Sequence, residues 1–87
     1  MKVKKVKLTT YYNLDGEYLS FPDNPLHNKV YENVNVKVNK TIRTIAGIDF
    51  EVDIIKITGC EDIECEFISQ YLAPDETLII KLCQDWG

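Results

Sequence analysis

Long hydrophobic runs are absent from this sequence, and its apolar stretches are as short as Leu78-Ile79-Ile80. A membrane-spanning helix needs about 20 apolar residues, and the core of a signal peptide needs about 7 to 15. Residues 1–8 instead interleave lysine with apolar side chains, which is typical of a strand. We therefore expect no membrane partner and a cytoplasmic location.

Cysteine and histidine are also scarce, with three cysteines and one histidine in the chain. An odd and sparse set of cysteines argues against a disulfide framework and for a reducing compartment. Cys60, Cys65, Cys83 and His27 are the residue types of a zinc site, but only Cys60 and Cys65 are closely spaced. We interpret the cysteines as small core residues and expect no metal and no cofactor.

Sequence motifs of catalysis are missing as well. The chain contains no G-x-x-x-x-G-K phosphate loop, no G-x-G-x-x-G dinucleotide fingerprint and no H-E-x-x-H metal motif. A catalytic cysteine would need His27 as its base, and no local signature supports that pair. A domain this small also leaves little room for a substrate pocket. We expect no catalytic residue, no small-molecule substrate and no enzymatic activity.

The composition is that of a folded protein, with 45% hydrophobic and 28% charged residues among 87. Neither a linker nor an internal repeat divides the chain. At this length about 60% of the surface of the unfolded chain is buried on folding, which is enough for one core. The sequence therefore predicts a single β-rich domain over residues 1–87.

Asp15-Gly16 is the clearest turn signal, because this dipeptide adopts the positive φ angles of a two-residue type I′ hairpin. The flanking residues are rich in Tyr, Thr, Leu and Phe, as strands are. With this turn Tyr12 lies opposite Leu19, and apolar side chains gather on one face of the hairpin. We predict an antiparallel hairpin in this register.

A second hairpin is predicted from two alternating apolar series. The series are Val34, Val36, Val38 and Ile42 on one strand, and Ile48, Phe50, Val52 and Ile54 on the next. A two-residue turn at Ala46-Gly47 would set Arg43 opposite Phe50. A three-residue loop over 45–47 instead sets Ile42 opposite Phe50, so that apolar side chains meet. We therefore expect the three-residue loop.

Later alternation predicts further strands around Ile63–Phe67 and Leu78–Leu82. Segment 66–72 also fits helical spacing, so one short helix there is an alternative. Five or six strands in so short a chain predict an all-β fold, with α+β as the alternative: a small, mostly antiparallel barrel or sandwich. Trp86 is expected to lie in the core.

Charge is distributed unevenly along the chain. Residues 1–43 carry eight basic and four acidic side chains, a net +4, whereas residues 44–87 carry two basic and ten acidic ones, a net −8. Basic and acidic strands that lie side by side would neutralise each other. Alternatively, the acids form a surface that imitates a phosphate backbone and meets a basic partner. That surface would consist of Glu61, Asp62, Glu64, Glu66, Asp75 and Glu76.

The favoured function is a non-catalytic protein-binding module of the kind that phages and mobile elements encode. Its acidic surface would block a basic, nucleic-acid-binding host protein. One alternative is a small structural subunit of a virion or complex, which pairs through uncovered strand edges and self-associates. Another is a single-stranded nucleic-acid binder that uses Lys5, Lys7, Tyr11 and Tyr18 on one face of the first hairpin. The acidic total makes direct nucleic-acid binding the less expected of these functions.

Overall fold

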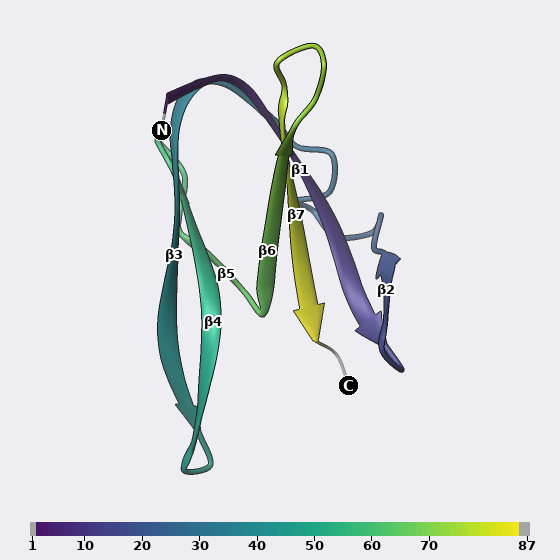
Figure 1. Cartoon of the computed structure of the whole chain (residues 1–87), viewed down its shortest axis with the longest axis vertical. Helices are drawn as coiled ribbons and strands as arrows, with labels where there is room; N and C mark the ends of the chain where they lie inside the picture. Colours follow the sequence, from purple (N-terminus) through teal and green to yellow (C-terminus); the bar gives the residue numbers. More distant parts are fainter. Residues whose placement is uncertain (1, 86–87) are drawn as a thin grey trace.

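A computed structural model of the chain describes residues 2–85, so Trp86 lies outside the described residues. These residues form one curved β-sheet without a helix, which confirms the all-β prediction (Figure 1). No helix among them is long and apolar enough to cross a membrane. The strands are β1 (Lys2–Leu14), β2 (Glu17–Ser20), β3 (Val30–Ile45), β4 (Ile48–Ile57), β5 (Ile63–Cys65), β6 (Phe67–Leu72) and β7 (Leu78–Asp85).

The strand order across the sheet is β5-β4-β3-β1-β7-β6, and β2 pairs with the far end of β1. The central pair, β1 with β7, is parallel, and every other pair is antiparallel. The sheet has seven strands, one more than the largest expected number, and it does not close. Segment 67–72 forms strand β6 instead of the alternative helix, because its backbone pairs along its whole length with β7.

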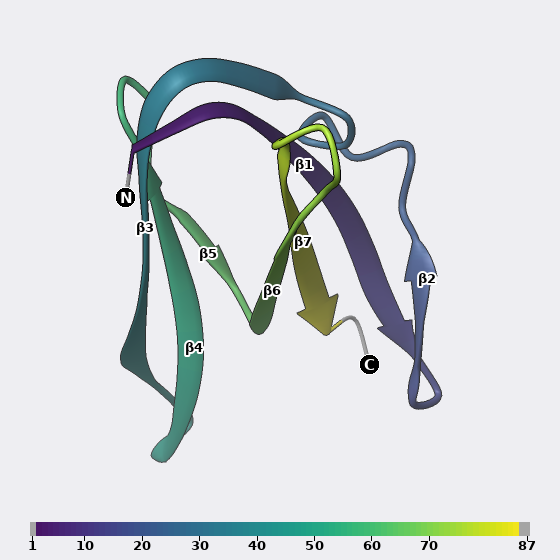
Figure 2. The ribbon, with the colours of Figure 1, turned by 45° about the horizontal axis from the view of Figure 1, so that its top comes forward.

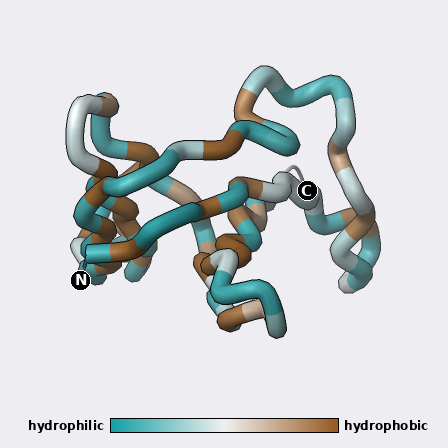
Figure 3. Tube along the Cα trace, turned by 90° about the horizontal axis from the view of Figure 1, so that it is seen from above, coloured by the Kyte–Doolittle hydropathy of each residue, from teal (hydrophilic) through white to brown (hydrophobic). Residues whose placement is uncertain are grey.

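The core lies on the inner face of the curved sheet, where alternate residues of the central strands point inward. Hydropathy alternates along these strands, as the alternation of colours in Figure 3 shows. Fully or nearly fully buried apolar side chains come from six of the seven strands. They are Val6, Leu8, Val36, Ile55, Ile57, Cys65, Ile68, Leu78, Ile80 and Leu82.

Strands β1 and β3 bend together near the start of β1 (Figure 2). Val6 pairs with Tyr31 and Val3 pairs with Val34, and all four side chains belong to the core or pack against it. The two inward residues of each strand are three positions apart, an odd number. Because side chains alternate between faces along a strand, the side that faces the core therefore changes between these pairs on both strands. Asn33 has a φ of 54°, a left-handed conformation that accommodates the bend in β3.

The first hairpin has the predicted turn and register. Asp15 and Gly16 have φ angles of 53° and 89°, and Tyr12 pairs with Leu19. The loop over 21–29 is fastened to β1 by the buried Thr10. The Thr10 N–H donates to Nδ1 of His27 at 3.0 Å, and its hydroxyl donates to the Phe21 carbonyl at 2.8 Å.

The predicted register of the second hairpin is wrong. Arg43 pairs with Phe50 and Ile45 with Ile48, so the connection is the two-residue turn Ala46-Gly47. Both turn residues have positive φ, 52° and 78°, as a type I′ turn requires. Matching apolar residues across the strands misled the prediction, because this end of the hairpin has no core to cover it.

Asp53 draws the two ends of the sheet together. It is 5% exposed, and Oδ2 accepts the backbone N–H of Ile68 in β6 at 2.8 Å. Oδ1 accepts Nζ of Lys40 at 3.0 Å, and this hydrogen bond raises the pKa of Lys40. The Gln84 amide also donates to the Glu64 carbonyl at 3.4 Å. The sheet therefore curls until β4 meets β6 and β5 meets β7.

Candidate functional site

The six acidic residues expected to form one surface lie in two separate places. Those at positions 61–66 run from the β4–β5 connection through β5, and those at 75 and 76 lie in the β6–β7 turn. Figure 1 shows β5 and this turn on different parts of the sheet. The structure therefore does not gather the six into one patch.

Basic side chains already pair with the acids near β5. Asp62 Oδ2 lies 3.4 Å from Nζ of Lys56, and Glu64 Oε1 lies 2.6 Å from Nε of Arg43. All four side chains are at least 41% exposed, so each pair contributes little to stability. Their effect is to lower the net charge of this part of the surface.

The β6–β7 turn is likewise close to lysines of β1. Glu76 lies 4.0 Å from Nζ of Lys4. Hydrogen bonds from Thr77, and then the charge of Lys5, hold the pKa of Asp75 below its ordinary value. The pairing of basic early strands with acidic later ones, weighed above as the alternative to an acidic surface, therefore describes four of the six acids.

Lys5, Lys7, Tyr11 and Tyr18 lie on the outer face of the sheet, away from the buried Val6, Leu8 and Thr10. Register places further residues of β1, β6 and β7 on this face. Tyr11 is in line with Cys83 and Phe67, Lys7 with Ile79 and Tyr71, and Thr9 with Lys81 and Ser69. Sequence analysis missed Phe67, Tyr71 and Lys81, although Phe67, Ser69 and Tyr71 alternate as strand residues do. We call Lys7, Tyr11, Tyr18, Phe67, Tyr71 and Lys81 the aromatic face.

The most prominent surface feature is a two-stranded ribbon, residues 40–52, which we call the arm. β1 pairs with β3 only as far as Asn35, and β5 pairs with β4 only from Asp53. Within residues 2–85 the arm therefore pairs only with itself, and both of its strand edges are uncovered. Figure 1 shows it extending from the body of the sheet.

The two-residue turn decides which way the apolar side chains of the arm point. Val38 pairs with Ile55, and these residues face the core. The alternate positions of β4 consequently face outward, and on β3 Ile45 shares that face with Ile48. They form an apolar stripe of Ile45, Ile48, Phe50, Val52 and Ile54. Toward the tip, Ile45, Ile48 and Phe50 are 64%, 59% and 46% exposed.

A hollow of about 450 Å³ adjoins this stripe. Ile45, Phe50 and Val52 line it on the arm, and Cys65 and Gln84 line it on the body. The ion pair between Arg43 and Glu64 described above also borders the hollow. The stripe therefore continues into a depression with apolar and polar walls.

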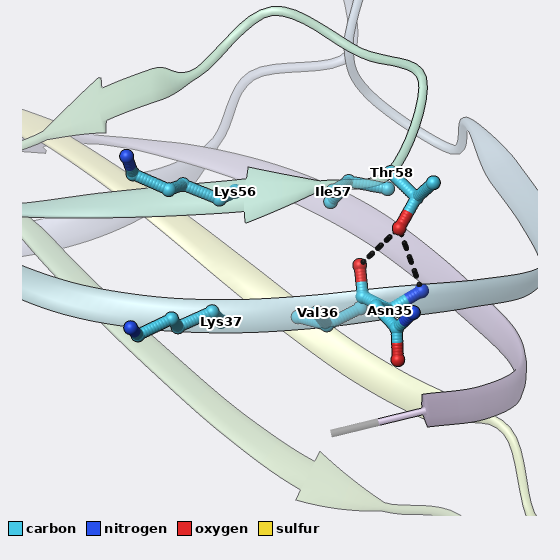
Figure 4. Close-up of a pocket in the computed structure, with 6 residues that line it drawn as sticks. All are labelled: Asn35, Val36, Lys37, Lys56, Ile57 and Thr58. Carbon is cyan, nitrogen blue, oxygen red and sulfur yellow. Dashed lines mark hydrogen bonds between the residues drawn. The ribbon is translucent and has the colours of Figure 1, made fainter.

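At the end of the β3–β4 pair away from the arm, Asn35, Lys37, Lys56 and Thr58 surround the buried Val36 and Ile57 (Figure 4). The Asn35 N–H donates to the Thr58 hydroxyl at 3.1 Å, which fastens the end of β4 to β3. Lys37 and Lys56 are direct cross-strand partners, a like-charge pair that opposes pairing. A hollow of about 350 Å³ lies among these residues.

A second apolar surface lies on the β1–β2 hairpin, on the other side of the sheet from the arm (Figure 2). Leu14 and Leu19 are 52% and 37% exposed. Tyr12 and Phe21 pack edge to face with ring centroids 5.6 Å apart, and they line a hollow of about 420 Å³. The sheet thus carries exposed hydrophobic side chains on both of its hairpins, β1–β2 and β3–β4.

The thiols are poorly suited to nucleophilic chemistry. Burial raises the pKa of Cys65 to about 12, and burial also raises the pKa of Cys83. Both groups are therefore protonated at neutral pH, and a protonated thiol is a weak nucleophile. Cys60 is hydrogen-bonded to Tyr31. Within residues 2–85, no three His, Cys, Asp or Glu side chains are arranged to hold a metal ion.

Comparison of the chain with models of protein families, with curated proteins and with solved structures found no match. The surfaces of residues 2–85 therefore carry the functional argument. Among these surfaces, the apolar stripe departs most from what a water-exposed sheet ordinarily presents.

Proposed function

We propose that the protein is a non-catalytic, self-assembling subunit whose arm docks on the β1–β2 hairpin of a neighbouring copy. The observation that carries this proposal is the outward apolar stripe. An acidic surface that blocks a basic host protein has less support, because four of the six acids already have basic neighbours. Three free cysteines support a reducing, cytoplasmic setting for the subunit.

Burial of the stripe against a partner would be favourable in free energy. Full burial of an isoleucine or phenylalanine side chain contributes about 1.5–3 kcal/mol. Ile45, Ile48 and Phe50 are 46–64% exposed on a ribbon with which no other strand of residues 2–85 pairs. A two-stranded hairpin by itself is only marginally stable in water. Contact with a second protein surface would bury the stripe and, at the same time, stabilise the arm.

Charge favours the β1–β2 hairpin as the receiving surface. The β3 strand around the arm carries Lys37, Lys40 and Arg43 and no acid between them, and two of these cations, Lys40 and Arg43, also pair with acids of the same chain. The β1–β2 turn and the loop after it carry Asp15, Glu17 and Asp23 and no base between them. Opposite charges along two uncovered edges steer the edges together and set their register.

Contact between two different surfaces of one chain is heterologous. Each copy would offer its arm to one neighbour and its β1–β2 hairpin to another, which builds a ring or a filament instead of a closed pair. Strand addition at the uncovered edges supplies backbone hydrogen bonds, and the exposed apolar side chains on both hairpins are covered by the same contact.

Sedimentation velocity over a wide concentration range tests self-assembly. Wild type should form species larger than a monomer, and Ile45→Asp should abolish them, because a charge would be buried in the contact. Leu72→Asp is the matched control: Leu72 is 66% exposed, close to the 64% of Ile45, but lies on β6. A wild-type chain that stays monomeric throughout, or equal effects of the two variants, would refute the proposal.

Mixing two defective variants tests which surfaces meet. Ile45→Asp keeps an intact β1–β2 hairpin, and Leu19→Asp keeps an intact arm. Each alone should be monomeric, whereas an equimolar mixture should form a heterodimer through the one contact that remains intact. A mixture that stays monomeric would show that the arm does not bind the β1–β2 hairpin.

A further inference from the structure

We propose that the aromatic face binds single-stranded nucleic acid, with an unpaired base held between Tyr11 and Phe67. This surface is distinct from the arm and goes beyond self-assembly. Three cross-strand rows build it on β1, β7 and β6: Lys7-Ile79-Tyr71, Thr9-Lys81-Ser69 and Tyr11-Cys83-Phe67. Tyr18 joins it from β2, where it pairs with Asn13 next to the third row.

The third row forms a slot for a planar ring. Neighbouring strands lie about 4.8 Å apart, so Tyr11 and Phe67 stand about two strand spacings apart on either side of Cys83. A shallow hollow of about 300 Å³ occupies this place, lined by Tyr11, Tyr18, Phe67 and Cys83 together with Ser69 and Lys81. Its walls are aromatic, and its floor carries a protonated thiol and a hydroxyl. Such a slot suits stacking of a nucleobase without demanding one particular base.

Lys81 supplies positive charge at one end of the slot. Its Nζ lies 5.7 Å from the ring centroid of Tyr11 and 5.6 Å from that of Tyr71. Two aromatic faces thus hold this ammonium group in place on the sheet. Lys7 lies in the adjacent row, two strands away from Tyr71 across Ile79. A phosphate on either side of a stacked base would find these two cations.

The charges around the face are of both signs. Glu66 directly precedes Phe67, and its charge reaches Cys83 in the slot, whereas Asp75 is near Lys5 at the far end of the face. Lys81 and Lys7 are the cations that an anionic ligand would meet on the face itself. Alternating rings and lysines are the combination that single-strand-binding surfaces use.

A single strand fits this face better than a duplex. The face is formed by strands alone, and among residues 2–85 no helix is present to enter a groove. Ring stacking also requires bases that are unpaired and turned outward. We expect binding to weaken with salt, because phosphate contacts release counterions.

Fluorescence anisotropy with a labelled oligothymidylate at low salt tests the proposal. Phe67→Ala should weaken binding at least about fivefold, the loss expected for one stacked base. Leu72→Ala is the control, since Leu72 is 66% exposed on the same strand, β6, but lies on the opposite face from Phe67. Lys81→Gln should weaken binding and lower the slope of affinity against salt by about one phosphate contact.

Five outcomes would overturn the proposal. Wild type that binds no oligothymidylate at low salt has no such site. Equal losses in Phe67→Ala and Leu72→Ala would place the ligand elsewhere, and so would loss of binding in Ile45→Asp. Tighter binding to the same oligonucleotide in a duplex would exclude a stacked, unpaired base. Heparin that binds equally well to wild type and Phe67→Ala, and displaces the oligonucleotide fully, would indicate charge alone.

Discussion

The two hairpins of this protein are closed by turns of the same type but meet very different surroundings. The β1–β2 hairpin continues from the central strand, and the loop over 21–29 is fastened against its base through Thr10 and His27. The β3–β4 hairpin extends from the body over residues 40–52, before Asp53, and within residues 2–85 this part pairs only with itself. The comparison shows that the turn fixes which side chains share a face, whereas the surroundings decide whether that face is buried.

The first way to break the comparison is to remove the anchor of the arm. Asp53→Ala leaves the buried Ile68 N–H without its acceptor and Lys40 without its closest partner, so the free energy of unfolding should fall by about 3 kcal/mol. Glu51→Ala removes only the exposed partner of Lys40 and should change it by less than about 0.5 kcal/mol. Urea denaturation measures both changes. Equal effects of the two variants would show that Asp53 does not anchor the arm to β6.

The anchor of the first hairpin should matter less. His27→Ala removes the acceptor of the Thr10 N–H, and Thr10 is only 1% exposed, so unfolding should become easier by about 1–2 kcal/mol. The exposed neighbour Lys29 is the control, and Lys29→Ala should stay within about 0.5 kcal/mol of wild type. An unchanged denaturation midpoint for His27→Ala would mean that water replaces the imidazole without loss.

The smallest effect is expected from making the two turns alike. Ala46 has a φ of 52°, which costs an alanine about 1 kcal/mol, whereas asparagine tolerates it. Ala46→Asn should therefore raise the free energy of unfolding by about 0.5–1 kcal/mol, and Asp15→Ala should lower it by a similar amount. Thermal denaturation at one protein concentration compares them. A destabilised Ala46→Asn would contradict the assigned turn.

Sequence reasoning recovered what local chemistry controls. Asp15-Gly16 specifies its turn directly, and the register of Tyr12 with Leu19 follows from it. The all-β class follows from alternation and from the absence of long helical patterns. Ala46-Gly47 is a weaker turn signal, so the second register was chosen by matching Ile42 with Phe50. That criterion assumes a covered sheet, and the arm is uncovered.

The sites were harder to predict than the fold because they depend on which strands become neighbours. Lys81 contacts Tyr11 only because β7 pairs in parallel with β1, and no local sequence pattern predicts that pairing. The six acids looked like one surface because they are close in sequence. The sheet instead places Glu64 against Arg43 and Glu76 near Lys4. Charge counted along a chain thus overstated the charge of the surface.

The parallel contact of β1 with β7 also has a consequence for folding kinetics. The two strands are central neighbours, yet contacts between them, such as that of Thr9 with Ile80, span 71 residues of sequence. Closing so large a loop costs conformational entropy before the favourable contacts between the strands can form. Contacts between residues far apart in sequence therefore slow the folding of small domains. The two hairpins can form locally and early. The middle of the sheet forms only when β7 pairs with β1. Until then, the edge of β1 that β7 covers in the native protein is exposed and can pair with other chains.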